Sequence, residues 1–252
     1  VTYPGGLFRD YVYAEVSHSP SGTPTNLTGI LDESGVRFAT FRYGDDDFPV
    51  STEHAGADKF TIDYDYLYYN RVKIQRPTGS LQERTFASVN GINKAVSIVT
   101  TCNGCATKTE SFTFDTNGNL DQYTNAAGII TDYDFDQNAR EVRRIEAAND
   151  SLGAKRTVLT TWDALHPLPS EMRILDSTGT LKTTRNWTYN LRGQVTSEKV
   201  TDSSSANSRT VATTYCEQAD VDASACPIVG LVKSMDGART DVQEETEVLA
   251  KS

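Results

Sequence analysis

A short phrase that occurs twice between residues 112 and 142 constrains the fold of this chain more than any other feature. Each copy opens with alternating aromatic and polar residues, Phe112 to Asp115 in the first copy and Tyr133 to Asp136 in the second. Such alternation is typical of a strand with one buried face, because successive side chains point to opposite faces. A turn signal follows each aspartate, since Asn and Gly tolerate positive φ and Asp bonds to its own backbone. Each copy therefore predicts one β-hairpin.

The aromatic residue that closes each such strand recurs along the chain. Phe114 and Phe135 are 21 residues apart, and Trp162 and Tyr189 are 27 residues apart. A recurring period of this length indicates a repeat architecture in which each unit is one supersecondary element. Because a second turn, such as Asn-Ala-Ala-Gly at 125–128, lies between the aromatic positions, the unit has two strands and two turns. The recurring aromatic residues are Tyr43, Tyr64, Phe114, Phe135, Trp162, Tyr189 and Tyr215.

These residues resemble the tyrosine-aspartate (YD) repeats of rearrangement-hotspot (RHS) proteins. The family pattern is roughly Tyr-Asp-x-x-Gly-Asn/Arg-Leu, then a Thr/Asp-x-x-Gly turn, then Thr-x-Tyr-x-Tyr-Asp, and residues 112–136 follow it almost throughout. The resemblance covers roughly residues 25 to 240. It implies an all-β fold, in which repeated antiparallel β-hairpins form an extended, spiralling β-sheet that is a segment of an RHS/YD-repeat shell.

The resemblance also implies a function. In that family the shell encloses a C-terminal toxin until its delivery, so we expect a non-catalytic structural segment that helps to encapsulate and export a toxin for interbacterial or host targeting. The expected partners are the remainder of a larger RHS polypeptide and its toxin cargo, and the expected location is secreted or at the bacterial cell surface. The Asp-Pro-x-Gly signature of the family's self-cleaving protease is absent from this sequence.

The resemblance divides the chain into a repeat region, residues 1–240, and an acidic non-repeat tail, residues 241–252. Residues 1–28 form a degenerate first unit and loop. The chain opens in mid-pattern with Val1, which predicts an excerpt of a longer polypeptide. A slice of repeat sheet leaves a strand edge at each end, and open edges predict self-association.

The net charge of -10 argues against nucleic acid and anionic membranes as partners. No apolar run approaches the ~20 residues that a membrane-spanning helix needs. The hydrophobic fraction of 37% is modest, and 12 Tyr, 9 Phe and 2 Trp supply much of the burial potential. That composition favours sheets with one wet face over a parallel sheet covered on both faces.

Four cysteines fall into two local pairs, which predict disulfides and an exported protein. Cys102 and Cys105 enclose Asn-Gly, the best sequence for a tight type I′ hairpin that would place the cysteines opposite one another. Cys216 and Cys226 bracket a loop that a second disulfide would close. Zinc is the alternative for these four residues, although the second pair lacks the spacing of a zinc knuckle.

The sequence contains no Gly-x-Ser-x-Gly, His-Glu-x-x-His, phosphate-binding glycine loop or Ser-x-x-Lys. His18, His54 and His166 have no Ser or Cys partner at a recognisable spacing. Asp132, Asp134 and Asp136 resemble a calcium loop, but the glycine and the final glutamate of that motif are absent. We therefore predict no enzyme, no cofactor and no metal.

The most aromatic run supports an alternative function, a cell-surface carbohydrate-binding β-repeat module. Exposed aromatic rings can stack on sugars, and in a repeat sheet the same rings are ordinary cross-strand pairs. Both interpretations stay open at this point. The candidate stacking residues are Tyr64, Tyr66, Tyr68, Tyr69 and Trp187.

Overall fold

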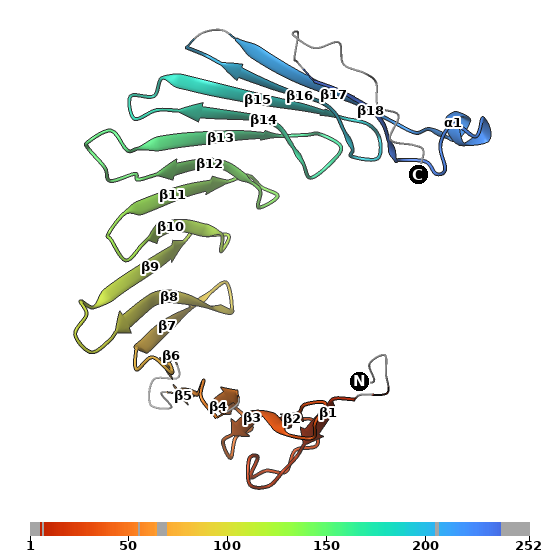
Figure 1. Ribbon diagram of the computed structural model, residues 1–252. Helices are drawn as coiled ribbons and strands as arrows, with labels where there is room; N and C mark the ends of the chain where they lie inside the picture. The colour runs from red at the N-terminus through yellow and green to blue at the C-terminus, as the bar shows by residue number, and fades with distance from the viewer. Residues whose placement is uncertain (1–5, 7, 55, 65–69, 205–206, 238–252) are drawn as a thin grey trace. The chain divides into compact units, whose positions relative to one another are not determined.

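The computed structural model describes residue 6 and residues 8–54, 56–64, 70–204 and 207–237. The chain divides into two compact units, Val1–Gly128 and Ile129–Ser252. Each unit is an antiparallel sheet whose strands follow one another in sequence order (Figure 1). The predicted acidic tail, residues 241–252, lies outside the described residues.

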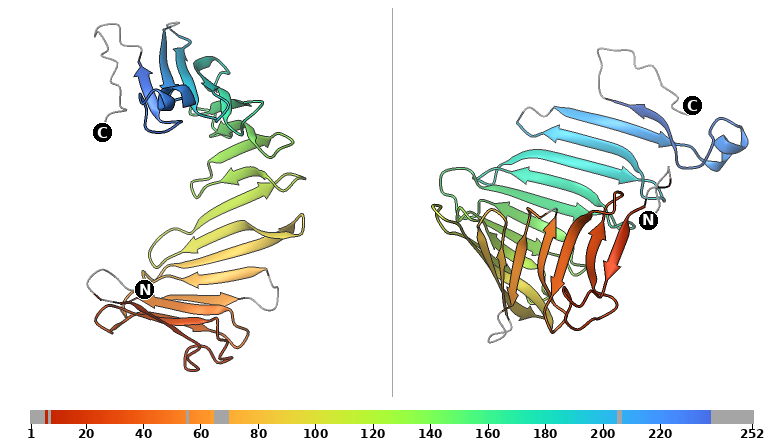
Figure 2. Two further views of the ribbon diagram at one scale, coloured as in Figure 1. Left: turned by 90° about the vertical axis from the view of Figure 1, so that its right-hand side faces the viewer. Right: turned by 60° about the horizontal axis from the view of Figure 1, so that its bottom comes forward.

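Among its described residues the first unit contains ten strands, and consecutive strands pair antiparallel. Figure 2 shows the neighbouring strands of each unit lying side by side. The strands are β1 (Asp10–Tyr13), β2 (Leu27–Leu31), β3 (Arg37–Tyr43), β4 (Pro49–His54), β5 (Phe60–Tyr64), β6 (Arg71–Gln75), β7 (Leu81–Val89), β8 (Ile92–Thr101), β9 (Lys108–Phe114) and β10 (Leu120–Thr124).

The described part of the second unit has the same organisation, with eight strands and one short helix, α1 (Gln218–Asp222), which precedes the last of these strands. The prediction of an all-β chain of repeated antiparallel hairpins is confirmed. The strands are β11 (Ile130–Phe135), β12 (Glu141–Glu146), β13 (Arg156–Trp162), β14 (Pro169–Leu175), β15 (Leu181–Tyr189), β16 (Val195–Asp202), β17 (Ser208–Tyr215) and β18 (Val232–Asp236).

The hairpin turns after Phe114, Phe135 and Tyr189 share one geometry, which Asp115 illustrates. Its side-chain oxygen Oδ1 accepts hydrogen bonds from the backbone N–H groups of Asn117 (2.9 Å) and Asn119 (2.8 Å). Gly118 then takes a positive φ of 86°, and the register shifts where Phe114 pairs with Leu120. An aspartate that bonds its own turn, followed by a left-handed residue and a bulge, connects two strands of right-handed twist. Local sequence therefore determines this turn.

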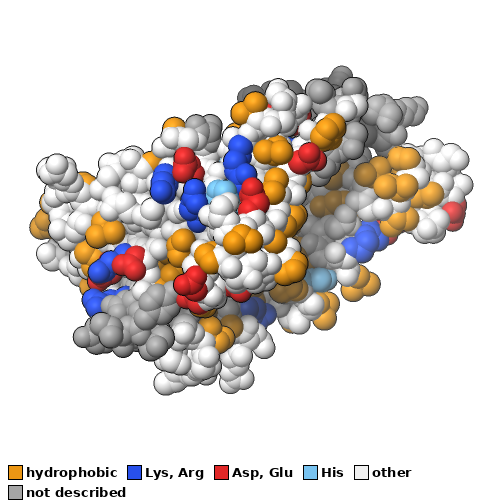
Figure 3. Space-filling view, turned by 90° about the horizontal axis from the view of Figure 1, so that it is seen from below, with side chains coloured by type: hydrophobic (Ala, Val, Ile, Leu, Met, Phe, Trp, Pro, Cys, Tyr) orange, Lys and Arg blue, Asp and Glu red, His pale blue; other side chains and the backbone are white. Residues whose placement is uncertain are grey.

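The sheets have little fully enclosed core. Among the described residues the buried apolar side chains are Ala39, Val158, Cys216 and Cys226. Most strand residues are half-buried, and apolar side chains lie among charged ones on the face shown in Figure 3. A sheet without a thick core depends on its ladder hydrogen bonds and on cross-strand side-chain contacts.

Candidate functional site

The closing aromatic residue of a hairpin is bound to the strand that precedes it. Tyr189, at the end of β15, donates its phenolic hydroxyl to the backbone carbonyl of Pro169, where β14 begins, at 2.6 Å. Tyr215, at the end of β17, makes the equivalent bond of 2.8 Å to the carbonyl of Val195, where β16 begins. We call this contact an aromatic tie, because it fastens the end of one strand to the start of its neighbour.

Aromatic ties occur in both units. In the first unit Tyr43 donates to the carbonyl of Leu27 at 3.0 Å, and Tyr64 donates to that of Pro49 at 3.1 Å. In the second unit the indole nitrogen Nε1 of Trp162 donates to the carbonyl of Glu141 at 2.9 Å. Each acceptor is the first residue of an even-numbered strand, so the tie is a regular part of the repeat.

Two of the recurring aromatic residues, Phe114 and Phe135, have no side-chain hydrogen-bond donor and cannot form a tie. The Phe135 ring instead packs against Tyr133, with ring centroids 6.4 Å apart. The ammonium of Lys94 lies 4.9 Å from the centroid of the Phe114 ring. These positions therefore keep the packing role of the aromatic ring and lose its hydrogen bond.

Burial raises the pKa of Tyr189, and the nearby carboxylates of Asp163 and Glu198 act in the same direction. A raised pKa keeps the phenol protonated, which the tie requires because the hydroxyl is the donor. The turn aspartates behave in the opposite way. A hydrogen bond from the side chain of Arg140 is the main cause of the lowered pKa of Asp136.

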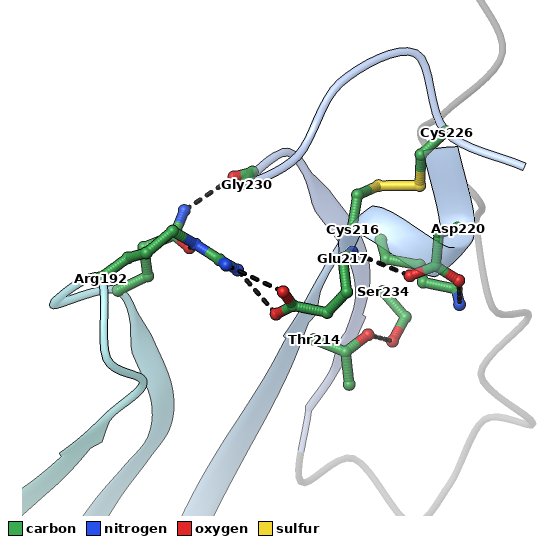
Figure 4. The surroundings of a disulfide bond; sticks show 10 residues. Arg192, Thr214, Cys216, Glu217, Asp220, Cys226, Gly230 and Ser234 are labelled. Carbon is green, nitrogen blue, oxygen red and sulfur yellow. Dashed lines mark hydrogen bonds and ion pairs between the residues drawn. A yellow bond between two sulfur atoms is a disulfide. The ribbon is translucent and has the colours of Figure 1, made fainter. Parts of the chain in front are cut away.

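The end of the second unit carries a structure that the repeat pattern does not contain, which we call the disulfide cap (residues 216–231). Cys216 follows β17 and is joined by a disulfide to Cys226, which lies beyond α1 (Figure 4). The two cysteines are buried, with exposed fractions of 0% and 5%. The loop returns to its start, because Gly230 donates its backbone N–H to the carbonyl of Cys216 at 2.8 Å.

The disulfide cap is bound to the turn between β15 and β16 (Figure 4). Arg192 in that turn makes a two-point ion pair with the carboxylate of Glu217, at 2.7 and 2.8 Å. Gln194 donates its side-chain amide to the carbonyl of Gly230 at 2.7 Å. Sequence analysis missed these contacts, because residues 25 and 36 positions apart carry no local pattern that pairs them.

The structure also contains a disulfide between Cys102 and Cys105, at the tip of the β8–β9 hairpin. The type I′ turn predicted for Asn103-Gly104 is wrong. Gly104 has a positive φ of 76°, but Asn103 is not among the residues with positive φ. The last ladder pair is Thr100 with Lys108, so the turn is wider than a two-residue hairpin. Asn103 therefore has none of the left-handed geometry that a type I′ turn requires.

The placements of the predicted stacking residues do not favour the carbohydrate-binding alternative. The Tyr64 hydroxyl is used in an aromatic tie, and its ring lies 5.3 Å from that of Phe48. Trp187 is half-buried in β15, opposite Glu198. Tyr66, Tyr68 and Tyr69 lie outside the described residues.

Within the part of the chain that the structure describes, no group of three or more His, Cys, Asp or Glu side chains is arranged to hold a metal ion. A search of the same residues finds no helix with the length and apolar character to cross a membrane.

Comparison with known proteins gives likeness of structure only. No family model matches this sequence, and no curated protein matches it. A crystal structure of TcdB2-TccC3 is similar over 98% of this chain, with 14% sequence identity and a TM-score of 0.59. A second similar structure is that of the Photorhabdus luminescens Tc holotoxin pore, at 10% identity over 96% of this chain with a TM-score of 0.40.

The TcdB2-TccC3 match at a TM-score of 0.59 covers a chain that belongs to the RHS/YD-repeat shell proteins. The chain described here has the RHS/YD-repeat fold. It spans 14% of the length of that similar chain. In this RHS-type sheet the aromatic ties occupy the positions where the repeat pattern places its tyrosine, so the sequence pattern and the fold coincide.

Proposed function

We propose that this chain is a non-catalytic structural segment of an RHS/YD-repeat shell that encapsulates a C-terminal toxin and helps to export it. The observation that carries the proposal is the aromatic tie, which recurs at the same position of successive hairpins in both units. The likeness to TcdB2-TccC3 supports it. Regular hydrogen bonds between neighbouring strands suit the sheet of a shell, because that sheet has to stay continuous around its contents.

The surface of the chain supports the same role. Large apolar side chains are exposed in both units, including Phe8 at 57%, Val36 at 61% and Leu191 at 89%. Exposed apolar groups suit contact with further protein. We propose that the partners are the remainder of a larger RHS polypeptide and its toxin cargo. The first and last strands, β1 and β18, then join further repeat strands or a second copy of the chain.

The disulfides support a location outside the cytoplasm. Disulfides persist in oxidising compartments and at cell surfaces. The structure holds two of them, one buried in the disulfide cap and one at a hairpin tip. We therefore propose that the protein is secreted or lies at the bacterial surface.

The test uses the native polypeptide. An antibody raised against residues 112–200 would be used to isolate the polypeptide that contains this segment from its source cells. We expect a product much larger than 252 residues whose C-terminal part resists protease while the shell is folded. Mild denaturant should then make that part cleavable. A native polypeptide of only 252 residues would contradict the proposal. So would a C-terminal part that the protease cleaves without denaturant.

A further inference from the structure

The first unit has an open concavity with a volume of about 710 Å³ on the face of its sheet formed by β4 to β7. Volumes of roughly 300–1,000 Å³ are typical of sites that bind small molecules. The residues that matter for its chemistry are His54, Asp58, Phe60, Ile74, Arg76 and Arg84.

The strand registers explain why these side chains share one face. Ile74 of β6 lies opposite Ile62 of β5 and opposite Gln82 of β7. Residues two apart on a strand point to the same face. Phe60 therefore lies on the face of Ile62, and Arg84 lies on the face of Gln82. This face combines an apolar floor with two arginines.

Neither of the two arginines has an acidic partner among the described residues. On the opposite face of the same strands, Arg71 and Lys73 approach Glu83 at 3.7 and 3.9 Å. Arginines elsewhere also pair with carboxylates, as Arg37 does with Glu15 at 2.6 Å. In a chain of net charge -10, two arginines that share the lining with a single carboxylate, that of Asp58, leave a local positive charge for a ligand to match.

Arg84 is held in position for such a ligand. Its Nε donates a hydrogen bond of 2.9 Å to the side-chain oxygen of Gln82, which is buried with 8% exposed. The terminal nitrogens of Arg84 make no hydrogen bond within the described residues. A guanidinium that is held through Nε alone keeps the N–H groups of its two terminal nitrogens available to donate to a carboxylate.

The lining also sets the charge of the ligand. Arg76 and Arg84 contribute two positive charges, and Asp58 contributes one negative charge. A monoanion balances this lining, whereas a dianion meets repulsion from Asp58. Phe60 and Ile74 supply the apolar surface for the rest of the molecule.

We propose that this concavity binds a small organic monoanion, a carboxylate that carries an apolar or aromatic group. The carboxylate lies at Arg76 and Arg84, and the apolar group packs on Phe60 and Ile74. Binding of this ligand is a function separate from a structural role in a shell, because a structural sheet does not require arginines without ion-pair partners on its face.

Calorimetry and NMR on the full chain test the proposal with 4-phenylbutyrate as the probe. We expect saturable binding, with the signals of His54 and Phe60 shifted. The neutral analogue 4-phenylbutanamide should bind weakly, because it brings no charge to the arginines. Butyrate should also bind weakly, because it lacks the ring. Equal binding of the acid and the amide would overturn the proposal, and so would an absence of saturable binding up to the solubility of the probe.

Three substitutions locate the site. Arg76→Gln and Arg84→Gln should each weaken 4-phenylbutyrate binding by roughly tenfold, the loss typical of a charged hydrogen bond. Asp58→Asn should strengthen it, because the opposing charge is removed. Arg209→Gln is the matched control, since Arg209 lies on β17 of the second unit and also has no ion pair among the described residues. An effect of Arg209→Gln equal to that of Arg84→Gln would overturn the proposal.

Circular dichroism of each variant separates lost binding from lost folding. If Arg84→Gln does not fold, Arg84→Lys replaces it. That variant keeps the charge without the planar fork, so it should bind more weakly than the wild type and more tightly than Arg76→Gln. Unchanged affinity in both Arg76→Gln and Arg84→Lys would overturn the proposal.

Discussion

The hydroxyl of Tyr215 donates a hydrogen bond of 2.8 Å to the backbone carbonyl of Val195, which joins the end of β17 to the start of β16. The carbonyl lies where the register of a hairpin shifts, at the pair of Tyr189 with Val195. A carbonyl at a bulge can lose its ladder partner. The tyrosine therefore supplies a donor to a carbonyl at a position where the ladder is irregular.

Removing one hydroxyl should measure the strength of an aromatic tie. Tyr189→Phe keeps the ring and deletes the bond to Pro169, so we expect the free energy of unfolding to fall by about 1 kcal/mol. Urea unfolding of the full chain, followed by circular dichroism, gives this value. Tyr133→Phe is the control, because the Tyr133 hydroxyl has no hydrogen-bond partner within the described residues. An equal decrease in the free energy of unfolding in the two variants would show that the tie does not contribute to stability.

Ala139 occupies the turn position that is glycine in most copies of the repeat, and it has a positive φ of 58°. A side chain in the left-handed region costs about 1 kcal/mol, so Ala139→Gly should raise the free energy of unfolding by about that amount. Gly179→Ala is the reverse experiment. Gly179 has a φ of 83°, and a Cβ there would meet no atom within 4 Å, so only backbone strain is added. Thermal unfolding should shift in opposite directions for the two variants, and shifts of the same sign would contradict this account.

The ion pair between Glu15 and Arg37 predicts a pH dependence. A hydrogen bond from Arg37 is the main cause that lowers the pKa of Glu15 from 4.5 to about 2. A carboxylate with a lowered folded-state pKa binds protons more readily when unfolded, so it adds stability that is complete above pH 4.5 and is lost as the pH falls towards 2.

Replacing the carboxylate tests this assignment. The Glu15→Gln variant should lose part of the decline in stability between pH 4.5 and 2. The measurement is the urea midpoint as a function of pH. Glu53→Gln is the control, because Glu53 has no ion pair in the described part of the chain. An unchanged pH profile in Glu15→Gln would refute the role of this pair.

The two disulfides should differ in their contribution to stability. Cys216 and Cys226 are separated by 10 residues, and Cys102 and Cys105 by 3. The entropy that a cross-link removes from the unfolded chain grows with loop length, which gives about 3 kcal/mol for the longer loop and about 2 kcal/mol for the shorter. Double serine variants of each pair test this difference by urea unfolding.

Hydrogen exchange adds a local measurement. Loss of the Cys216–Cys226 disulfide should speed exchange of the backbone N–H groups of Cys216 and Gly230, which form the closing hydrogen bonds of the cap. The Cys102/Cys105 serine variant should leave both amides unchanged. Faster exchange in that control would mean that the effect is not local to the cap.

Sequence reasoning succeeds here where structure is local. The turn at Asp115 was predictable, because the aspartate, the amides it binds and Gly118 lie within four residues. The tie from Tyr189 to Pro169 was not predictable, because the acceptor is a backbone carbonyl 20 residues away and any residue has one. The Asn103-Gly104 dipeptide predicted a tight type I′ turn, but the turn in the structure is wider.

The concavity lay beyond sequence reasoning for a related reason. Arg76 and Arg84 look like ordinary solvent-exposed arginines in a strand pattern. Their shared face follows from the registers of β5, β6 and β7, which pair Ile62 with Ile74 and Ile74 with Gln82. No short sequence motif indicates those registers. That neither arginine makes an ion pair with a described carboxylate is visible only when the neighbouring strands are in place.

The pairing of each strand with its neighbours in sequence has a consequence for how the chain is made. Such contacts have short loops to close, so little chain entropy opposes them before they form. A hairpin can pair as soon as its second strand leaves the ribosome, and the next hairpin then adds to an existing edge. Because Pro169 is synthesised before Tyr189, the aromatic tie between them can form as soon as Tyr189 has emerged, and it closes a hairpin whose first strand is already in place.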